Sequence, residues 1–224
     1  MTSRKTVIES VVNMASVSFP GSAGSLHLGG IVGVAWFTKK EIVIKNCANY
    51  GSVTSTGALS GSVNLGGIAG QAVHGTKYIQ NCLNYGEITY TGDSISAFVG
   101  GIIGTGSGGN ITIDNCVNMG KVKSKNKDAV CVGNVAGHFN NFEASEVAHC
   151  YWSSETGHDS YCHCHESSVT PSDCYKFDAS SFELTDTVSI GSFRGKSLIG
   201  ALNAGVDSNN DGYSTRTRMT SHSQ

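Results

Sequence analysis

Apolar residues recur in short clusters along most of this chain, with Gly or Asn between the clusters. Within a cluster, Ile or Val occupies about every second position, as Ile111 and Ile113 do, and this spacing is typical of a β-strand. Each Gly in a helix interior costs about 1 kcal/mol relative to Ala. The chain has 29 Gly residues, and no Gly-free stretch shows the period of a helical repeat. The pattern therefore predicts an all-β protein.

Two short blocks repeat at a nearly constant interval. The block Asn-Cys-x-Asn-x-Gly begins at Asn46, Asn81 and Asn115, and a degenerate copy begins at His149. Successive Cys of this block are separated by steps of 35, 34 and 34 residues. The block Gly-Gly-Ile-x-Gly keeps the same interval, beginning at Gly29, Gly66 and Gly100, with a variant at Gly133. A constant period indicates a repeat protein whose units bury their apolar faces by stacking on one another.

A period of about 34 residues divides into three short strands and three turns, which is one coil of a β-solenoid. We expect one strand at the Gly-Gly-Ile block, one at the Ile-x-Asn-Cys block, and one at residues 52–54, 87–90 and 121–123. The predicted fold is therefore a parallel β-solenoid (β-helix) of about four coils with a C-terminal cap.

Stacked coils place equivalent residues about 4.8 Å apart, so identical residues should form columns. One column is an amide ladder at a turn (Asn49, Asn84 and Asn118). A second is a set of Gly residues expected to adopt positive φ (Gly51, Gly86 and Gly120). A third is a column of small buried residues, expected to be mostly free thiols (Cys47, Cys82, Cys116 and Cys150).

The repeats suggest a division of the chain into four parts. Residues 1–152 form the solenoid, whose first coil is incomplete because residues 7–17 match the middle of a later repeat. Residues 153–176 form an irregular segment rich in Cys and His, residues 177–204 form the cap with a short helix at 197–203, and residues 205–224 are expected to be disordered. The N-terminus shows no signal peptide, which favours a piece of a longer protein.

These repeats resemble the GLUG-motif repeats of bacterial and protist cell-surface proteins, including the repeat region of some bacterial IgA-cleaving metallopeptidases. The resemblance rests on Gly-Gly-Ile-x-Gly followed by Ile-x-Asn-Cys-x-Asn-x-Gly-x-Val, and it covers roughly residues 7–205. The segments that begin at Cys150 (CYWSSETG) and at Ser197 (SLIGALNAG) also resemble the unit that closes such arrays. The resemblance implies a β-solenoid and a cell-surface or secreted location. It implies no activity, because the catalytic His-Glu-x-x-His of those enzymes does not occur here.

Composition excludes several functions. Only 14% of residues are charged and the net charge is −2, so the chain lacks the basic surface that nucleic acids or anionic membranes require. No apolar stretch approaches the roughly 20 residues of a membrane-spanning helix. The alternating Lys residues between Lys121 and Lys127 are interpreted as a solvated edge, with an anion or glycan site as the alternative.

The irregular segment holds the candidate metal ligands: Cys162, His163, Cys164, His165 and Cys174. Zinc takes four such ligands, but a C-x-C pair lacks the usual gap of two to four residues between ligands. For an exterior protein, disulfides among Cys131 and the Cys of this segment are the favoured interpretation. The alternatives are that these residues bind zinc, or that they form neither disulfides nor a metal site.

Two further sites are weaker candidates. Asp207, Asn209 and Asp211, followed by Gly212, resemble the start of a calcium loop, but Arg218 stands where the bidentate Glu belongs and no flanking helix pattern was found. A solvated turn is therefore preferred there. Asn110 begins the N-glycosylation sequon Asn-Ile-Thr, which can be used only if the chain is secreted.

The functional prediction follows from the extended surface of a solenoid. Tyr50 and Tyr85 should lie in register on one turn and form the best candidate for ligand contact. We expect a non-catalytic structural or adhesion module whose partner is a protein or glycan on a host or neighbouring cell, with no bound cofactor. The alternative is a carbohydrate-active β-helix, but the columns of equivalent residues mix charges and do not pair carboxylates.

Overall fold

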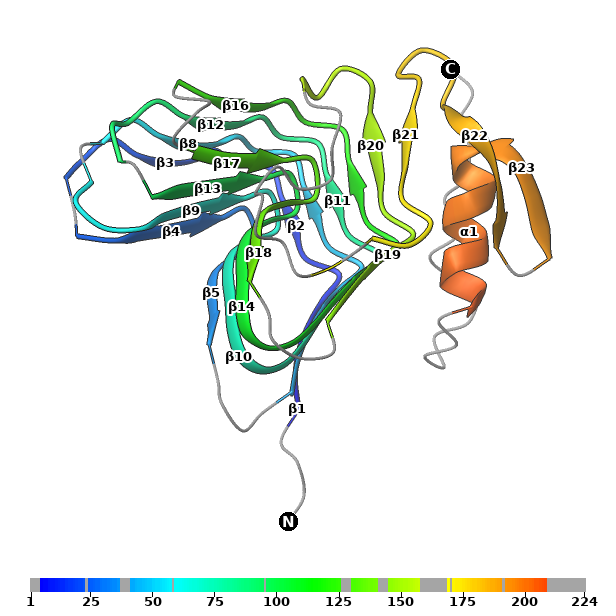
Figure 1. The fold of residues 1–224 in the computed structure, drawn as a ribbon, viewed down its shortest axis with the longest axis horizontal. Coiled ribbons are helices and arrows are strands. Elements are labelled where there is room, and N and C mark those ends of the chain that lie inside the picture. The colour runs from blue at the N-terminus through cyan, green and yellow to red at the C-terminus, as the bar shows by residue number, and fades with distance from the viewer. Residues whose placement is uncertain are drawn as a thin grey trace.

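A computed structural model describes residues 5–22, 24–36, 41–57, 59–94, 96–125, 130–140, 145–157, 169, 171–190 and 192–208 of this chain. Parallel strands stack into a β-solenoid, and each coil passes in turn through four sheets, which are numbered 1 to 4 in chain order (Figure 1). The predicted all-β solenoid is confirmed, whereas the prediction of three strands per coil was wrong. The Gly-Gly-Ile block does not form one strand, because the chain turns there and passes from sheet 4 into sheet 1.

Sheet 1 contains β1 (Lys5–Glu9), β5 (Val32–Trp36), β6 (Glu41–Lys45), β10 (Ala69–Gln80), β14 (Ile103–Asp114), β18 (Ala136–Asn140) and β19 (Glu146–Ala148). Sheet 2 contains β2 (Val12–Asn13), β7 (Ala48–Asn49), β11 (Leu83–Asn84), β15 (Val117–Asn118), β20 (Tyr151–Ser153), β21 (Tyr175–Phe177), β22 (Glu183–Ile190) and β23 (Phe193–Ser197). Sheet 3 contains β3 (Val17–Phe19), β8 (Val53–Ser55), β12 (Ile88–Tyr90) and β16 (Val122–Ser124). Sheet 4 contains β4 (Leu26–Gly29), β9 (Val63–Gly66), β13 (Ala97–Gly100) and β17 (Val130–Gly133).

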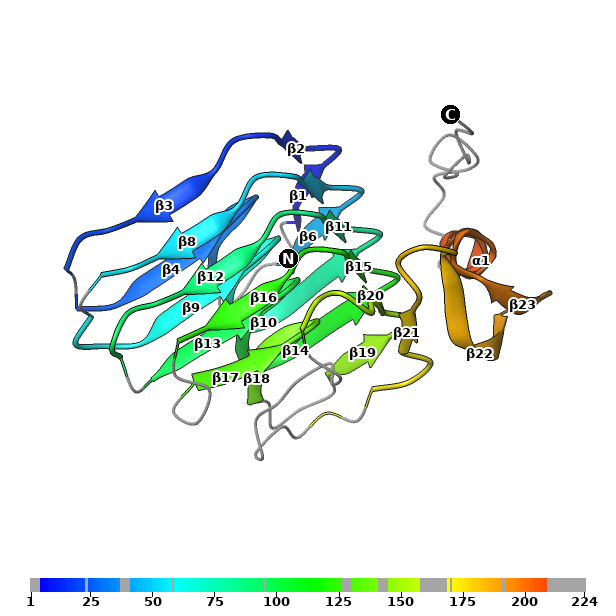
Figure 2. The same cartoon turned by 90° about the horizontal axis from the view of Figure 1, so that it is seen from above.

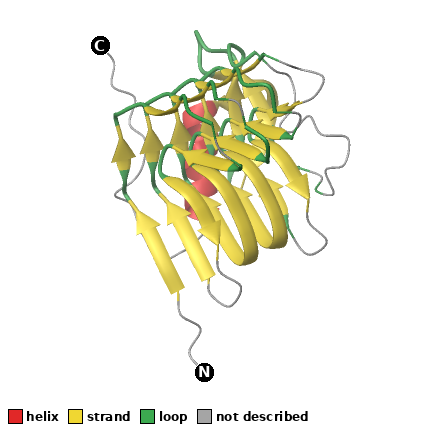
Figure 3. Ribbon diagram, turned by 90° about the vertical axis from the view of Figure 1, so that its left-hand side faces the viewer, coloured by secondary structure: helices red, strands yellow, loops and turns green. Residues whose placement is uncertain are grey.

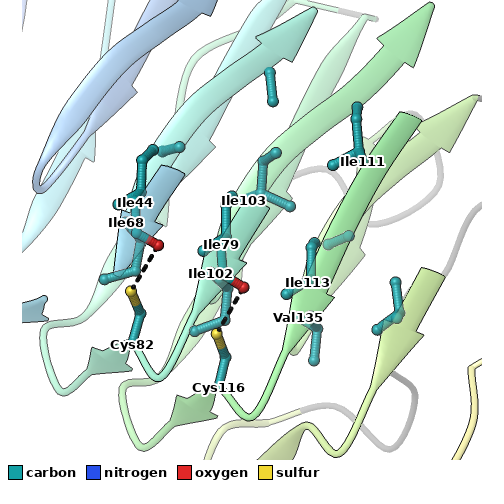
Figure 4. Packing of buried hydrophobic residues seen from close by; sticks show 14 of the residues in the cluster. Ile44, Ile68, Ile79, Cys82, Ile102, Ile103, Ile111, Ile113, Cys116 and Val135 are labelled. Atoms are coloured by element: carbon teal, nitrogen blue, oxygen red, sulfur yellow. Dashed lines mark hydrogen bonds between the residues drawn. The ribbon is translucent and has the colours of Figure 1, made fainter. Parts of the chain in front are cut away.

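Equivalent residues of successive coils pair directly. Ile79 pairs with Ile44 in the coil before and with Ile113 in the coil after, and strands of successive coils run side by side (Figure 2). These three Ile side chains point inward and are almost completely buried (Figure 4). Because the period of side-chain direction in a strand is two, this register places every second residue of the repeat in the interior.

The interior of each coil is divided into two apolar cores. One lies inside the curve of sheet 1 and includes the Ile column and the Cys column. The other lies between sheets 3 and 4 and includes Val53, Leu65 and Ile88. The predicted Asn ladder and the observed Gly-Gly turns meet at the boundary between these cores.

The amide ladder is confirmed, and it extends one coil further than predicted. The Nδ2 of Asn13 donates to Oδ1 of Asn49, the Nδ2 of Asn49 to Oδ1 of Asn84, and the Nδ2 of Asn84 to Oδ1 of Asn118, each at 2.8 Å. Each of these Nδ2 groups also donates to the carbonyl oxygen two residues later, such as that of Gly86 for Asn84. Asn49, Asn84 and Asn118 have no exposed surface. Their amides are therefore satisfied entirely within the protein.

The second Gly of each Gly-Gly pair is required by this ladder. A Cβ added to Gly67 would lie 2.2 Å from Cγ of Asn84 and 2.2 Å from the carbonyl oxygen of Gly101. Gly30 faces Asn49 in the same way, and Gly101 faces Asn118. Each ladder amide thus contacts backbone on the opposite side of its own coil, which only Gly permits.

The predicted positive φ of Gly51, Gly86 and Gly120 was wrong. None of the three adopts it, and they are Gly for a steric reason. A Cβ on Gly86 would lie 2.0 Å from the carbonyl oxygen of Gly51 in the coil before, and the other two positions meet the same obstacle. The left-handed residue is instead the one directly before each ladder Cys: Ser10 (before Val11, where the Cys is replaced), Asn46, Asn81, Asn115, His149 and Asp173. Asn tolerates this conformation better than most residues.

The cap extends sheet 2 and covers part of its outer face. β22 pairs antiparallel with β21, β23 pairs antiparallel with β22, and the helix α1 (Leu198–Ser208) lies beside β22 and β23 (Figure 1). Helix α1 is longer than the predicted helix at 197–203, and it is the helix drawn in Figure 3. In the described part of the chain, no helix is long and apolar enough to span a membrane.

The ladder predicts a large cost for removing one amide. Asn84→Ala removes an acceptor for Asn49, a donor to Asn118 and a donor to a backbone carbonyl, so we expect the free energy of unfolding to fall by about 2–4 kcal/mol. Ser52→Ala, which removes a solvent-exposed contact with Ser16 between coils, should cost less than about 0.5 kcal/mol. Urea unfolding monitored by circular dichroism measures both, and equal losses would contradict the stabilising role of the ladder.

The steric account of Gly86 predicts that no side chain is tolerated there. Gly86→Ala should destabilise the protein by about 3 kcal/mol or more, and Gly86→Asn should be at least as harmful. If a left-handed backbone were the reason for Gly86, Asn would instead be tolerated. Gly24→Ala is the matched control, because a Cβ there has no neighbour within 4 Å. Thermal unfolding midpoints of the three variants separate these explanations.

Candidate functional site

The two Tyr residues predicted to contact a ligand lie on the outer face of sheet 2. Tyr50 and Tyr85 are 43% and 55% exposed, and their ring centroids are 5.8 Å apart. Met14 occupies the equivalent position one coil earlier and is 72% exposed, and Val12 lies beside it on the same face. We call these four residues the sheet 2 stripe. All four side chains are exposed and none is charged at neutral pH, which is the composition of an interface core rather than of an electrostatic site.

The cap covers the continuation of the stripe. Val117, Tyr151 and Phe177 are buried against Leu198 and Leu202 of α1, and Met119, which follows Tyr85 in the column, packs against the same cluster. The Nδ2 of Asn115 donates to the carbonyl oxygen of Leu202 at 3.1 Å and fixes the helix over this corner. A small pocket remains between α1 and the coils, lined by Asn81, Cys82, Asn115, Val117, Leu202, Asn203 and Val206. The outer face of sheet 2 is therefore covered in the later coils and open in the earlier ones.

A cluster of ionisable residues lies where the last coils meet. His149 Nδ1 lies 2.8 Å from Asp114 Oδ1, and His149 Nε2 lies 3.9 Å from Asp173 Oδ2. The hydrogen bond with Asp114 raises the pKa of His149, while burial opposes the rise. Asp173 also accepts a hydrogen bond from the hydroxyl of Tyr175 at 3.2 Å. This cluster is not evident in the sequence, because its members come from three different coils and only the coil register brings them together.

The Cys column is confirmed, and it contains a fifth member. Cys47, Cys82, Cys116, Cys150 and Cys174 are free thiols. Each Sγ donates to the carbonyl oxygen two residues earlier, at 3.1–3.3 Å, and lies 3.5–3.8 Å from a carbonyl oxygen of the coil before. Figure 4 shows two of the longer contacts, from Cys82 to Ile44 and from Cys116 to Ile79. Burial raises the pKa of Cys82, Cys116 and Cys150 well above its ordinary value, which makes these thiols poor nucleophiles.

Cys174 was predicted to belong with the Cys of the irregular segment, and this assignment was wrong. Tyr175 pairs with Tyr151, so Cys174 follows Cys150 directly in the column although only 24 residues separate them. Its thiol is engaged by backbone carbonyls of the stack. Cys131 is disulfide-bonded, as the exterior interpretation favoured, and its partner lies outside the described residues.

Other predicted ligands are only partly described. Cys162, His163, Cys164 and His165 lie outside the described residues, and the described residues contain no group of three or more His, Cys, Asp and Glu that could hold a metal ion. Asp207 belongs to α1, so a helix does precede the proposed calcium loop, contrary to the sequence analysis. Asn209 and Asp211 lie outside the described residues, and both ion sites stay predictions.

The structure describes the positions of the predicted glycosylation residue and of two of the alternating Lys residues. Asn110 lies inside β14, paired with Thr76, and its Oδ1 is buried without a hydrogen-bond partner. Lys123 pairs with Glu87 at 2.8 Å, and Lys125 pairs with Asp93 at 3.2 Å. The first contact lowers the pKa of Glu87. These exposed pairs between coils agree with the interpretation of the Lys residues as a solvated edge.

Comparisons with known proteins support the fold. No protein-family model matches the chain, and no curated protein matches it in sequence. The chain is similar to the crystal structure of "a putative immunoglobulin A1 protease from Bacteroides ovatus", with a TM-score of 0.50 and 20% sequence identity. The match covers 87% of this chain and 62% of the other, so this chain spans less than two thirds of that protein. At this identity the similarity shows a shared fold, and the GLUG-motif resemblance stays a prediction.

The Cys column predicts a pattern of thiol protection. In the native protein, iodoacetamide should leave Cys47, Cys82, Cys116 and Cys150 unmodified for hours, and all four should react once the protein is unfolded. Cys174, which is partly exposed, should react first among the column thiols. Peptide mapping by mass spectrometry before and after reduction also tests the disulfide of Cys131. Rapid native alkylation of Cys116 would contradict the buried column.

Proposed function

We propose that this chain is a non-catalytic structural and adhesion module of a cell-surface or secreted protein, and that the sheet 2 stripe contacts a protein on a neighbouring or host cell. The observation that carries the proposal is the exposed column of Met14, Tyr50 and Tyr85 on the open part of sheet 2. The resemblance to surface-protein repeats and the structural similarity to a protein named as an immunoglobulin A1 protease support an exterior location.

The composition of the stripe favours a protein partner. Tyr and Met are enriched in the buried centres of protein interfaces, where their apolar surface is desolvated and the Tyr hydroxyl can still find a partner. Val12 and Met14 extend the apolar surface beyond the aromatic pair, and they offer no hydrogen bonds to sugar hydroxyls. A glycan ligand, which would use the two Tyr rings alone, is therefore the second choice.

The rigid stack suits this function. The stripe residues lie on or directly after the parallel strands β2, β7 and β11, whose inward-facing residues Asn13, Asn49 and Asn84 are fixed by the amide ladder. A surface held by such contacts loses little conformational entropy when a partner binds. A carbohydrate-active enzyme would instead need two carboxylates about 5–9.5 Å apart around an accessible bond. Among the described residues, the carboxylates of Asp114 and Asp173 both approach the imidazole of His149.

Binding to cells tests the proposal. Fluorescently labelled chain should bind cultured epithelial cells. The double variant Tyr50→Ser and Tyr85→Ser should lose at least about tenfold in affinity, because truncating central aromatic residues typically costs more than about 1.4 kcal/mol. Trp36→Ser is the matched control, since Trp36 is 61% exposed on sheet 1. Thermal unfolding of each variant confirms that the fold is retained.

Treatment of the cells separates the two partner classes. Trypsin treatment should abolish binding if the partner is a protein, and periodate oxidation should leave it. Loss of binding after periodate alone would replace the protein partner with a glycan. Equal binding of the wild type and the double Tyr variant would overturn the role of the stripe.

A further inference from the structure

The left-handed position before each column residue changes character at the end of the array. It is Asn in the second, third and fourth coils described here, at Asn46, Asn81 and Asn115. In the next two coils it is His149, with φ 47°, and Asp173, with φ 49°. An uncharged amide is thus replaced by two ionisable groups at the place where the coils shorten and the cap begins.

Three successive coils contribute to one contact at this place. Asp114 is the last residue of β14, His149 lies in the turn between β19 and β20, and Asp173 lies in the turn before β21. The imidazole lies between the two carboxylates, with its Nδ1 2.8 Å from Asp114 and its Nε2 3.9 Å from Asp173. The side chains of Asp114 and His149 are 10% and 25% exposed, so solvent screens their contact only partly.

Among the described residues, a further acidic group acts on His149 in the same direction. Glu146 of β19 is a third acidic neighbour that favours the protonated imidazole. The Tyr175 hydroxyl of β21 donates to Asp173 and orients that carboxylate. The imidazole of His149 therefore faces acidic residues from β14, from β19 and from the turn before β21. A positive charge on His149 is attracted to all of them.

We propose that His149, held between Asp114 and Asp173, is a pH-dependent contact that fastens the last coil to the rest of the solenoid, and that it holds more tightly in acid. Among the described residues, the last coil pairs with the coil before it through three residue pairs of β20 and β21 and through the bridge between Ala148 and Ser172, so the His149 contact adds to a short junction. The cap follows it directly through the pairing of β21 with β22.

The direction of the effect follows from the pKa of His149, which is raised in the folded protein above its ordinary value of 6.5. The protonated form binds the carboxylates, so its contribution to stability is complete below the ordinary pKa. This contribution is lost as the pH rises through the raised pKa of the folded state. Attachment of the last coil should therefore weaken from mildly acidic to mildly alkaline solution.

Hydrogen exchange measures this attachment at defined amides. The amide of Tyr175 donates to the carbonyl oxygen of Cys150 across the last coil junction, and the amide of Leu83 makes the equivalent bond to Cys47 between inner coils. After correction for intrinsic exchange, protection of Tyr175 should fall by about tenfold more than protection of Leu83 between about pH 5.5 and about pH 8.5. Equal changes at the two amides would overturn the proposal.

The substitution His149→Asn tests the assignment, because Asn occupies this position in the inner coils and tolerates the left-handed backbone. The variant should fold, and protection of Tyr175 should no longer depend on pH beyond that of Leu83. His74→Asn is the matched control: His74 also has a left-handed backbone, with φ 55°, but its Nδ1 contacts the carbonyl oxygen of Gly108. It should retain the wild-type pH dependence.

A measurement on the unmodified chain keeps the test independent of variant folding. An NMR titration of the His ring resonances should give His149 a pKa above its ordinary value, and Asp114→Asn should lower it. A His149 pKa at or below 6.5 in the wild-type protein would overturn the proposal, as would an unchanged pH dependence of Tyr175 protection in His149→Asn.

Discussion

The contact between the ladder amides and the Gly-Gly turns is the constraint on which the rest of this solenoid depends. Asn84 lies against Gly67 on the opposite side of its own coil, with no room for a Cβ between them. This contact closes each coil at its middle and separates the core of sheet 1 from the core of sheets 3 and 4. The Asn-Cys-x-Asn-x-Gly block and the Gly-Gly-Ile-x-Gly block are therefore in contact.

The coil register shows this coupling directly. The offset between paired residues is 37 on both sides of the first Gly-Gly turn, from Leu26 and Val63 before it to Val32 and Ala69 after it. The offset is likewise constant at 35 through the Asn turn, from the pairing of β6 with β10 to that of β8 with β12. In the coils before β20, the offset changes in the turn between sheets 3 and 4 and between the two halves of sheet 1, such as β5 and β6. In these coils, length variation therefore occurs away from the amide ladder, and it is absent where the ladder meets backbone.

Sequence was sufficient to predict the features that repeat with identical residues. The period, the parallel stack, the amide ladder and the free thiols all follow from residues that recur at one interval. The reason for Gly86 could not be predicted, because it lies in the carbonyl group of Gly51 one coil away and not in the local backbone. Cys174 was misassigned for a related reason: only 24 residues separate it from Cys150, so the shortened interval removed it from the pattern although its thiol makes the same backbone contacts as the other four.

Departures from a ladder are more informative than its members, since each repeated residue is explained by its neighbours above and below. Asn46, Asn81 and Asn115 suit the left-handed turn as uncharged amides, and Asn115 also bonds the carbonyl oxygen of Leu202 in α1. His149 and Asp173 occupy the same backbone conformation, which does not require a charge. The same logic applies to the outer face of sheet 2. Tyr50 and Tyr85 lie in a column that α1 covers from Met119 onward, so their exposure is a property of the open coils and not of the strand pattern. In this solenoid, specific surface chemistry lies where equivalent positions of successive coils no longer carry the same residue.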